Sequence, residues 1–269
     1  MGGENELFVR IWRPTTPPLG VVAIVPGFNS HSGHYLWAAA QLTALGFAVY
    51  AVDLRGRGKS SGPRFHVEDF DEYVSDVHSL VKLARSQEQG LPVFMLGHSA
   101  GGVIATAYCL EHQDNLAGLV CESFALEVPA PGPVLSFVKW ISQYLPTLRV
   151  LKLPNKQFSR DPSVVAALNA DPLIHGEKQT ALTVAQMLRG NARLKRGFGD
   201  LTLPVLIMHG TADTVTLQKG SELFYTDVGT RNRTLKLYEN HYHDLLNDVD
   251  RDIPMADIAN WLQANLPKR

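Results

Sequence analysis

The chain of 269 residues lacks several features that would place it in other protein classes. Its 25 basic and 26 acidic residues nearly cancel, which argues against a partner such as nucleic acid or a strongly anionic membrane. It has only two cysteines, too few for a disulfide-stabilised scaffold. No apolar run approaches the roughly 18 residues that a membrane-spanning helix needs. A composition of 45% hydrophobic residues instead suits a globular domain with a large core.

The cysteines and the first residues bear on the compartment. Cys109 and Cys121 lie in apolar runs, so we expect core thiols in a reducing compartment, with one disulfide as the alternative. The start, MGGENELFVRIW, has no basic segment followed by an apolar stretch, and no signal peptide is expected. Glu6 stands where N-myristoylation favours Ser or Thr. Together these features predict a cytoplasmic protein without a stable membrane anchor.

Short apolar runs rich in β-branched residues recur along the chain and predict strands. They are LFVRIW (7–12), VVAIV (21–25), FAVYAV (47–52), VFMLG (93–97), GLVCE (118–122), VLIMHG (205–210) and TLKLY (234–238). The middle runs are continuously apolar, as in strands buried on both faces. Between these runs, apolar residues recur at the spacing of a helix, most clearly over residues 70–84. The alternation predicts an α/β protein with a mostly parallel, doubly wound sheet.

One region interrupts this alternation. From Ser123 to about Gly199 no convincing buried strand is visible, and the segment opens with the proline-rich ALEVPAPGP before amphipathic helical patterns begin. We expect residues 1–122 and 200–269 to form the core. Residues 123–199 would form a helical lid (cap) insertion over the carboxyl ends of the strands, where ligands of such sheets bind. An insertion without a functional role is the alternative.

The stretch VFMLGHSAGGVIATAY, residues 93–108, places Ser99 between Gly97 and Gly101 where a buried strand should end. Residues without a Cβ let the backbone turn sharply from strand to helix. The pattern matches the G-x-S-x-G nucleophile elbow, in which a strained serine exposes its hydroxyl. The alternative is a glycine-rich turn whose serine only caps a helix. The strand before Ser99 and the helix after it favour a nucleophile.

A serine nucleophile needs a base, and the base needs an orienting acid. In an elbow of this kind the acid follows a late strand and the histidine follows the final one. VLIMHGTADTVT supplies Asp213 after the 205–210 run, and TLKLYENHYHDLLND supplies His241 and His243. Residue type and order alone leave both histidines open.

These segments resemble the monoacylglycerol lipase/lysophospholipase branch of the α/β-hydrolase superfamily over nearly the whole chain. The matching motifs are GHSAGG (97–102), HGTAD (209–213), HDLLND (243–248), DLRGRGKSSGPR (53–64) and SRDPSVVAALNADPLIH (159–175). The resemblance selects His243 as the base, because it precedes Asp-Leu-Leu, and makes Asp213 the acid. It leaves His241 as a solvent-exposed loop residue, His209 as a structural residue and His98 as a packing residue.

The resemblance also implies an oxyanion hole. PGFNSHSGHY, residues 26–35, is similar to the family's H-G-x-x-x-H-S-x-x-Y, with proline replacing the first histidine. By this match the donors are the backbone N–H groups of Phe28 and of Ala100, the residue after the nucleophile. Arg57 and Leu54 replace residues that are usually histidine in the family, and we expect them to affect packing near this loop.

Glu122 departs from the family, which usually has a small residue there. It ends the strand after the elbow, and a buried carboxylate is costly unless it is paired. Three roles stay open: a partner for a lid or core group, a pocket-lining or supporting residue, or the triad acid itself.

The resemblance thus implies a serine carboxylic-ester hydrolase that cleaves monoacylglycerol-like or other hydrophobic esters without a metal or organic cofactor. Apolar residues of the insertion favour a hydrophobic substrate group, unless they only pack the insertion onto the core. They are Phe124, Leu126, Val134, Val138, Ile141, Leu145 and Leu148. The alternatives on the same triad are a small-molecule alkyl or aryl esterase, an acyltransferase, a C–C hydrolase and a perhydrolase. A non-catalytic ligand receptor is a more remote alternative. The expected partner is a small ester, with transient contact to a lipid surface.

Overall fold

The computed structural model describes residues 6–267, so the expectation about the first residues, MGGEN, lies outside it. Its main sheet has seven strands in the order β1-β3-β2-β4-β5-β8-β9. They are β1 (Val9–Trp12), β2 (Gly20–Val25), β3 (Phe47–Val52), β4 (Val93–His98), β5 (Gly118–Glu122), β8 (Val205–Gly210) and β9 (Arg233–Tyr238). Only β1 runs antiparallel to its neighbour; the other pairs are parallel. The predicted strands and the predicted mostly parallel sheet are therefore confirmed.

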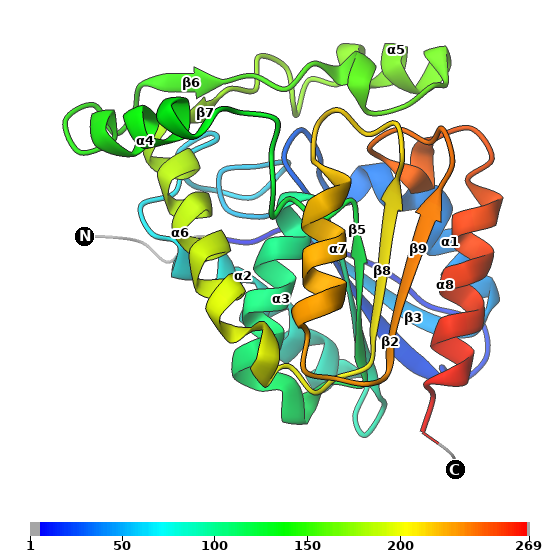
Figure 1. The fold of residues 1–269 in the computed structure, drawn as a ribbon. Coiled ribbons are helices and arrows are strands. Elements are labelled where there is room, and N and C mark those ends of the chain that lie inside the picture. Colours follow the sequence, from blue (N-terminus) through cyan, green and yellow to red (C-terminus); the bar gives the residue numbers. More distant parts are fainter. Residues whose placement is uncertain (1–5, 268–269) are drawn as a thin grey trace.

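Helices cover both faces of the sheet, and each face has its own apolar core (Figure 1). One face carries α1 (Leu36–Ala44) and α8 (Asp252–Ala264), and the other carries α2 (Phe70–Gln87), α3 (Ala100–His112) and α7 (Gln218–Asp227). Every residue of β2, β3, β4, β5 and β8 is buried, which explains their uninterrupted apolar sequences. Among residues 6–267, no helix combines the length and apolarity required to cross a membrane.

Residues 123–199 enter after β5 and return to the sheet at β8. They form α4 (Gly132–Ile141), β6 (Arg149–Leu151), α5 (Pro162–Ala170), β7 (Gln179–Thr180) and α6 (Ala181–Gly197), with the 3-10 turn Asn155–Gln157 before α5. In Figure 1, α4, β6, β7 and α5 lie beyond the carboxyl ends of the strands, while α6 descends beside α2 and α3.

The insertion is not purely helical, because β6 and β7 pair as a small antiparallel sheet. Strands of three and two residues are too short to show the alternation by which a strand is recognised in a sequence. The two free thiols, Cys109 and Cys121, are buried in the core as expected, and no disulfide joins them.

The first turn of α3 lies directly against the end of β2. A Cβ on Gly101 would stand 2.1 Å from the carbonyl oxygen of Val25 and 2.5 Å from that of Pro26. Both are backbone atoms near the centre of the sheet, so neither can move aside cheaply. This close approach brings the start of α3 and the loop after β2 together around Ser99.

We therefore predict that Gly101→Ala destabilises the fold by about 3 kcal/mol, the upper end of the usual cost of overpacking. Gly132→Ala is the matched control, because a Cβ at that position meets nothing within 4 Å. Its free energy of unfolding should change by less than about 0.5 kcal/mol. Urea denaturation of the purified variants measures both values, and equal stability of the two would contradict the contact.

Candidate active site

Ser99 occupies the apex of the turn between β4 and α3. Its backbone has φ 56° and ψ −121°, a conformation that non-glycine residues rarely adopt. Strained backbone of this kind is typically found at functional sites. Its N–H donates to the carbonyl oxygen of Glu122 at 2.8 Å, which ties the apex to the end of β5. The Ser99 side chain makes no capping hydrogen bond to α3, so its hydroxyl is not used to begin the helix.

Asp213 and His243 come together from the loops after β8 and β9. The Nδ1 of His243 lies 2.7 Å from Oδ2 of Asp213, and both side chains are fully buried. The other oxygen of Asp213 accepts the backbone N–H groups of Val215 and Thr216 at 2.7 and 3.0 Å. The hydroxyl of Thr216 donates to Oδ2 at 2.8 Å.

These contacts keep Asp213 ionised. Burial by itself would raise the pKa of Asp213, but the charge of His243, its hydrogen bond and the nearby His209 ring hold the pKa well below its usual range. His209 is also anchored from its other side, with Nδ1 2.8 Å from the hydroxyl of Ser221. Sequence reasoning made His209 only structural and missed its position 3.3 Å from the carboxylate.

Nε2 is the ring nitrogen of His243 that does not contact Asp213. Within residues 6–267 this buried nitrogen has no hydrogen-bond partner, and Ser99 forms no hydrogen bond to it. Such bonds often tighten only when substrate binds. The His243 ring packs against Phe158 and His98, with centroids 5.0 and 4.9 Å away. Phe158, from the insertion, is a neighbour that no sequence pattern identified.

Two backbone N–H groups beside Ser99 are without acceptors in the described part of the chain: those of Phe28 and Ala100. Ala100 begins α3, where the first N–H groups of a helix have no internal partner. Phe28 lies in the loop after β2, next to Gly27, whose Cβ would stand 2.9 Å from the Cβ of Ser99. The loop can approach the serine this closely because Gly27 has no side chain.

A cavity of about 370 Å³ opens onto Ser99, Ala100 and Phe28. Its remaining lining is mostly apolar and comes largely from the insertion, including Val134, Leu135, Val138, Leu151, Val184 and Met187. Asn191, Lys152 and Gln157 are among its few polar groups. A mostly apolar cavity with a few polar groups is typical of sites for small organic ligands.

Comparisons with known proteins identify the family of this chain. Residues 16–250 match the hydrolase family described as serine aminopeptidase, S33. Monoacylglycerol lipase of Mycolicibacterium smegmatis is 34% identical over 98% of this chain and 95% of its own. Monoglyceride lipase of Homo sapiens is 35% identical over 90% and 81%. The crystal structure of the monoacylglycerol lipase from Paleococcus ferrophilus has a TM-score of 0.88 at 28% identity, covering 97% and 99% of the two chains.

The chain belongs to the monoacylglycerol lipase-like serine hydrolases of the α/β-hydrolase superfamily. The resemblance found in the sequence is thereby confirmed, and so is the α/β-hydrolase fold.

Glu122 of this hydrolase binds the loop that follows His243 and is not among the residues that line the cavity. Its side chain is fully buried; Oε1 accepts the N–H of Leu246 at 3.2 Å, while Oε2 has no partner among the described residues. Burial, together with the nearby charge of Asp244, raises the pKa of Glu122 well above its ordinary value. Burial also lowers the pKa of the neighbouring His98 to about 4. A carboxyl with a raised pKa and an imidazole with a lowered pKa therefore lie beside the His243 loop.

Two groups of side chains have the residue types of a metal site. In each group the ligating atoms lie within 4.8 Å of one another: His31, His34 and Asp171, and His98, Glu122 and Asp244. In the first, Nδ1 of His31 accepts the N–H of Gly33 at 3.0 Å, so Nε2 of a neutral ring carries the proton. That proton points to Asp171 at 2.8 Å. Hydrogen bonds between the loop after β2 and the insertion thus account for the group of His31, His34 and Asp171.

The expectation that His241 is solvent-exposed is wrong. His241 is only 6% exposed, and its backbone packs against the end of β8. The carbonyl oxygen of His241 accepts the N–H of Ala212 at 3.1 Å and would lie 2.3 Å from a Cβ on Gly210.

We predict that Glu122→Gln changes how stability depends on pH. The folded protein holds the Glu122 proton above about pH 4.3, where the unfolded chain has lost it. The free energy of unfolding should therefore fall by about 1.4 kcal/mol per pH unit as pH rises from the unfolded pKa to the raised folded one. The glutamine keeps an acceptor for Leu246 but cannot ionise, so the variant should lack this term.

Urea denaturation of both proteins from pH 5 to 8 measures the effect. The stability of Glu122→Gln relative to wild type should increase with pH. Parallel stability curves would show that Glu122 ionises in the folded protein as readily as in the unfolded chain.

Proposed function

We propose that this hydrolase cleaves carboxylic esters with a hydrophobic group, with Ser99 as the nucleophile, His243 as the base and Asp213 as the orienting acid. One observation carries the proposal: a serine in strained backbone geometry opens onto a mostly apolar cavity. The buried His243–Asp213 pair, with its free Nε2, supports the same assignment.

The proposed reaction uses only groups of this chain. Oγ of Ser99 attacks the ester carbonyl, and Nε2 of His243 takes the hydroxyl proton and passes it to the leaving alcohol. Asp213 stabilises the imidazolium through the Nδ1–H bond. The N–H groups of Phe28 and Ala100 donate to the oxyanion that forms on the carbonyl oxygen. Water, activated by His243, then hydrolyses the acyl-enzyme.

We assign residues 123–199 the role of a lid, because they supply most of the apolar wall of the cavity. Four of the expected apolar residues divide between two tasks. Phe124 and Leu126 are buried in the core, whereas Val134 and Val138 line the cavity. Because monoacylglycerol lipases are among its relatives, a glycerol monoester is the first candidate substrate for this chain. A second candidate is a short-chain or aryl esterase, since about 370 Å³ is near the lower end of the usual range for ligand sites.

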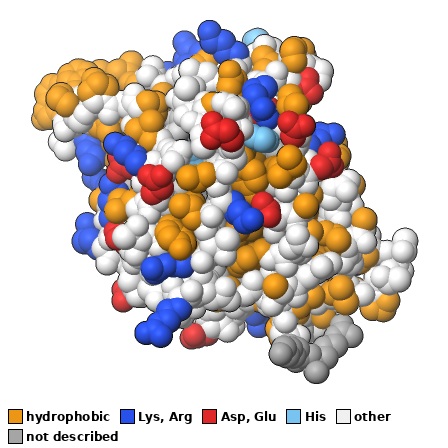
Figure 2. Space-filling view, turned by 45° about the vertical axis from the view of Figure 1, so that its right-hand side comes forward, with side chains coloured by type: hydrophobic (Ala, Val, Ile, Leu, Met, Phe, Trp, Pro, Cys, Tyr) orange, Lys and Arg blue, Asp and Glu red, His pale blue; other side chains and the backbone are white. Residues whose placement is uncertain are grey.

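The outer face of α4 and the residues after it favour transient contact with a lipid surface. Large apolar side chains are exposed there: Phe137, Trp140, Tyr144, Leu145 and Leu148. Figure 2 shows an apolar patch at its upper left, on the projecting end of the insertion. Exposed patches of this kind commonly mark interaction sites. The buried free thiols Cys109 and Cys121 support a cytoplasmic location.

Ser99→Ala should lower kcat for p-nitrophenyl esters by about 10⁴–10⁶-fold, because the attacking oxygen is removed. A ladder from acetate to palmitate, run beside monoacylglycerols, measures substrate preference. Maximal activity on monoacylglycerols and longer chains supports the first candidate, and activity confined to acetate, butyrate or aryl esters supports the second.

A fluorophosphonate probe should label the wild type at Ser99. Tight ester binding without turnover or labelling would refute the enzymatic proposal.

Phe137→Ser with Trp140→Ser should weaken sedimentation with phosphatidylcholine vesicles, because the variant loses its largest exposed apolar side chains on α4. Hydrolysis of water-soluble p-nitrophenyl acetate should stay within about twofold, since neither residue lines the cavity. Ile253→Ser is the control, because Ile253 is 57% exposed but lies on α8. Equal loss of vesicle binding in both proteins would argue against a specific role for α4.

A further inference from the structure

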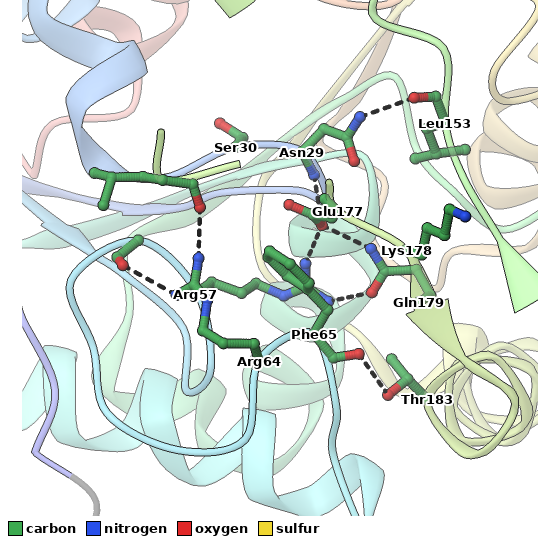
Figure 3. Close-up of polar contacts among 12 residues, drawn as sticks. Asn29, Ser30, Arg57, Arg64, Phe65, Leu153, Glu177, Lys178, Gln179 and Thr183 are labelled. Atoms are coloured by element: carbon green, nitrogen blue, oxygen red, sulfur yellow. Dashed lines mark hydrogen bonds and ion pairs between the residues drawn. The ribbon is translucent and has the colours of Figure 1, made fainter. Parts of the chain in front are cut away.

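A buried polar network connects the insertion to the loop that carries Phe28 (Figure 3). Its charged members are Arg57, from the loop after β3, and Glu177, from the insertion just before β7; they are 1% and 3% exposed. Nη1 of Arg57 forms an ion pair with Oε1 of Glu177. Nη2 of Arg57 donates to Oε1 of Gln179 at 2.5 Å.

Glu177 also binds the backbone of the oxyanion loop. The same Oε1 accepts the N–H of Asn29 at 2.9 Å and the side-chain amide of Gln179 at 2.6 Å. Asn29 has φ 55°, in the left-handed region that asparagine adopts more readily than other non-glycine residues. Its side chain donates to the carbonyl oxygen of Leu153 at 3.0 Å and to Asn155 at 2.9 Å. The insertion therefore holds Asn29 by both its backbone and its side chain.

Arg57 holds the adjacent residue from the other side. Its guanidinium carbon lies 4.0 Å from the centroid of the Phe28 ring, a contact in which the cation is attracted to the ring face. The peptide that follows Phe28 is thus oriented by Glu177, and the Phe28 side chain is oriented by Arg57. Both restraints act on Phe28, which borders the cavity together with Ser99 and whose own N–H is free of acceptors in the described chain.

Fold stability alone does not explain this network. Removing two charges from water costs about as much as their mutual attraction returns, so a buried ion pair is a weak stabiliser. Here Oε2 of Glu177 and Nε of Arg57 are also buried without partners among the described residues. What the pair does supply is a fixed geometry for residues 28 and 29.

We propose that Glu177 and Arg57 are positioning residues that set the Phe28 N–H for the oxyanion, so that the insertion completes the oxyanion hole. The inference rests on the proposed ester hydrolysis. An oxyanion donor contributes mainly in the transition state, and its value depends on alignment prepared before the reaction. Loss of the network should therefore lower kcat and leave KM nearly unchanged.

The test is Glu177→Gln, which keeps the shape and one acceptor but removes the anion. We expect kcat for p-nitrophenyl butyrate to fall about tenfold or more, with KM within about twofold; complete loss of one donor costs about 10²–10³-fold. The affinity for a trifluoromethyl ketone, which forms a tetrahedral oxyanion with the serine, should fall in parallel with kcat/KM. The affinity for a non-reactive ether analogue of a monoacylglycerol should not change.

Lys178→Gln is the matched control. It removes a charge one residue away, from an exposed side chain that takes no part in the network, and should keep wild-type kcat. If Glu177→Gln does not fold, Arg57→Met combined with Glu177→Gln removes both charges together and should show the same loss of kcat.

Rates are expressed per serine labelled by a fluorophosphonate, so partial unfolding does not lower them. Unchanged kcat per labelled site and unchanged ketone affinity in a folded variant would overturn the positioning role while leaving ester hydrolysis intact. A wild type that is neither labelled nor active would instead overturn the proposed function, and the positioning role with it.

Discussion

The approach of α3 to the end of β2 is the contact on which the site depends. Gly101 lies so close to the Val25 carbonyl that no side chain fits between them. The helix can therefore begin immediately after β4, which places Ser99 in a tight turn at positive φ. The same proximity brings the loop after β2 against the serine, with Gly27 in contact. The turn, the free N–H of Ala100 and the position of Phe28 all follow from packing that side chains would prevent.

Two buried acids near His243 have pKa values shifted in opposite directions. At Asp213 the charge of His243 and the contacts with His209 and His243 outweigh burial, so its pKa is held well below its usual range. At Glu122 burial and the nearby charge of Asp244 outweigh the backbone hydrogen bonds from residues 245 and 246, so its pKa is raised. The low pKa of His98 avoids a second positive ring beside His243. The neighbouring charges, and not depth in the protein alone, decide the direction in which each pKa moves.

The insertion combines two structural tasks that a simple cover would not need to perform. Its α4, β6 and the start of α6 contribute the apolar wall of the cavity, while Leu153, Asn155 and Glu177 bind Asn29. Its last helix, α6, packs along α2 and α3 and so belongs also to the outer layer of the core. Because the insertion is bonded to Asn29, the position of the insertion also sets the position of the loop beside Ser99.

The sequence by itself determined the seven strands of the main sheet, their mostly parallel arrangement and the turn at Ser99. Continuous apolar runs indicate local burial, and glycine spacing indicates local backbone shape. Asp213 and His243 could be named from their order along the chain, with the family resemblance choosing between His241 and His243. Only the tertiary structure showed that His241 is buried, that Glu122 supports Leu246 and that Arg57 meets Glu177 across 120 residues. These pairings depend on how the insertion and the late loops dock against the sheet, and a polar side chain carries no periodic pattern that names its distant partner.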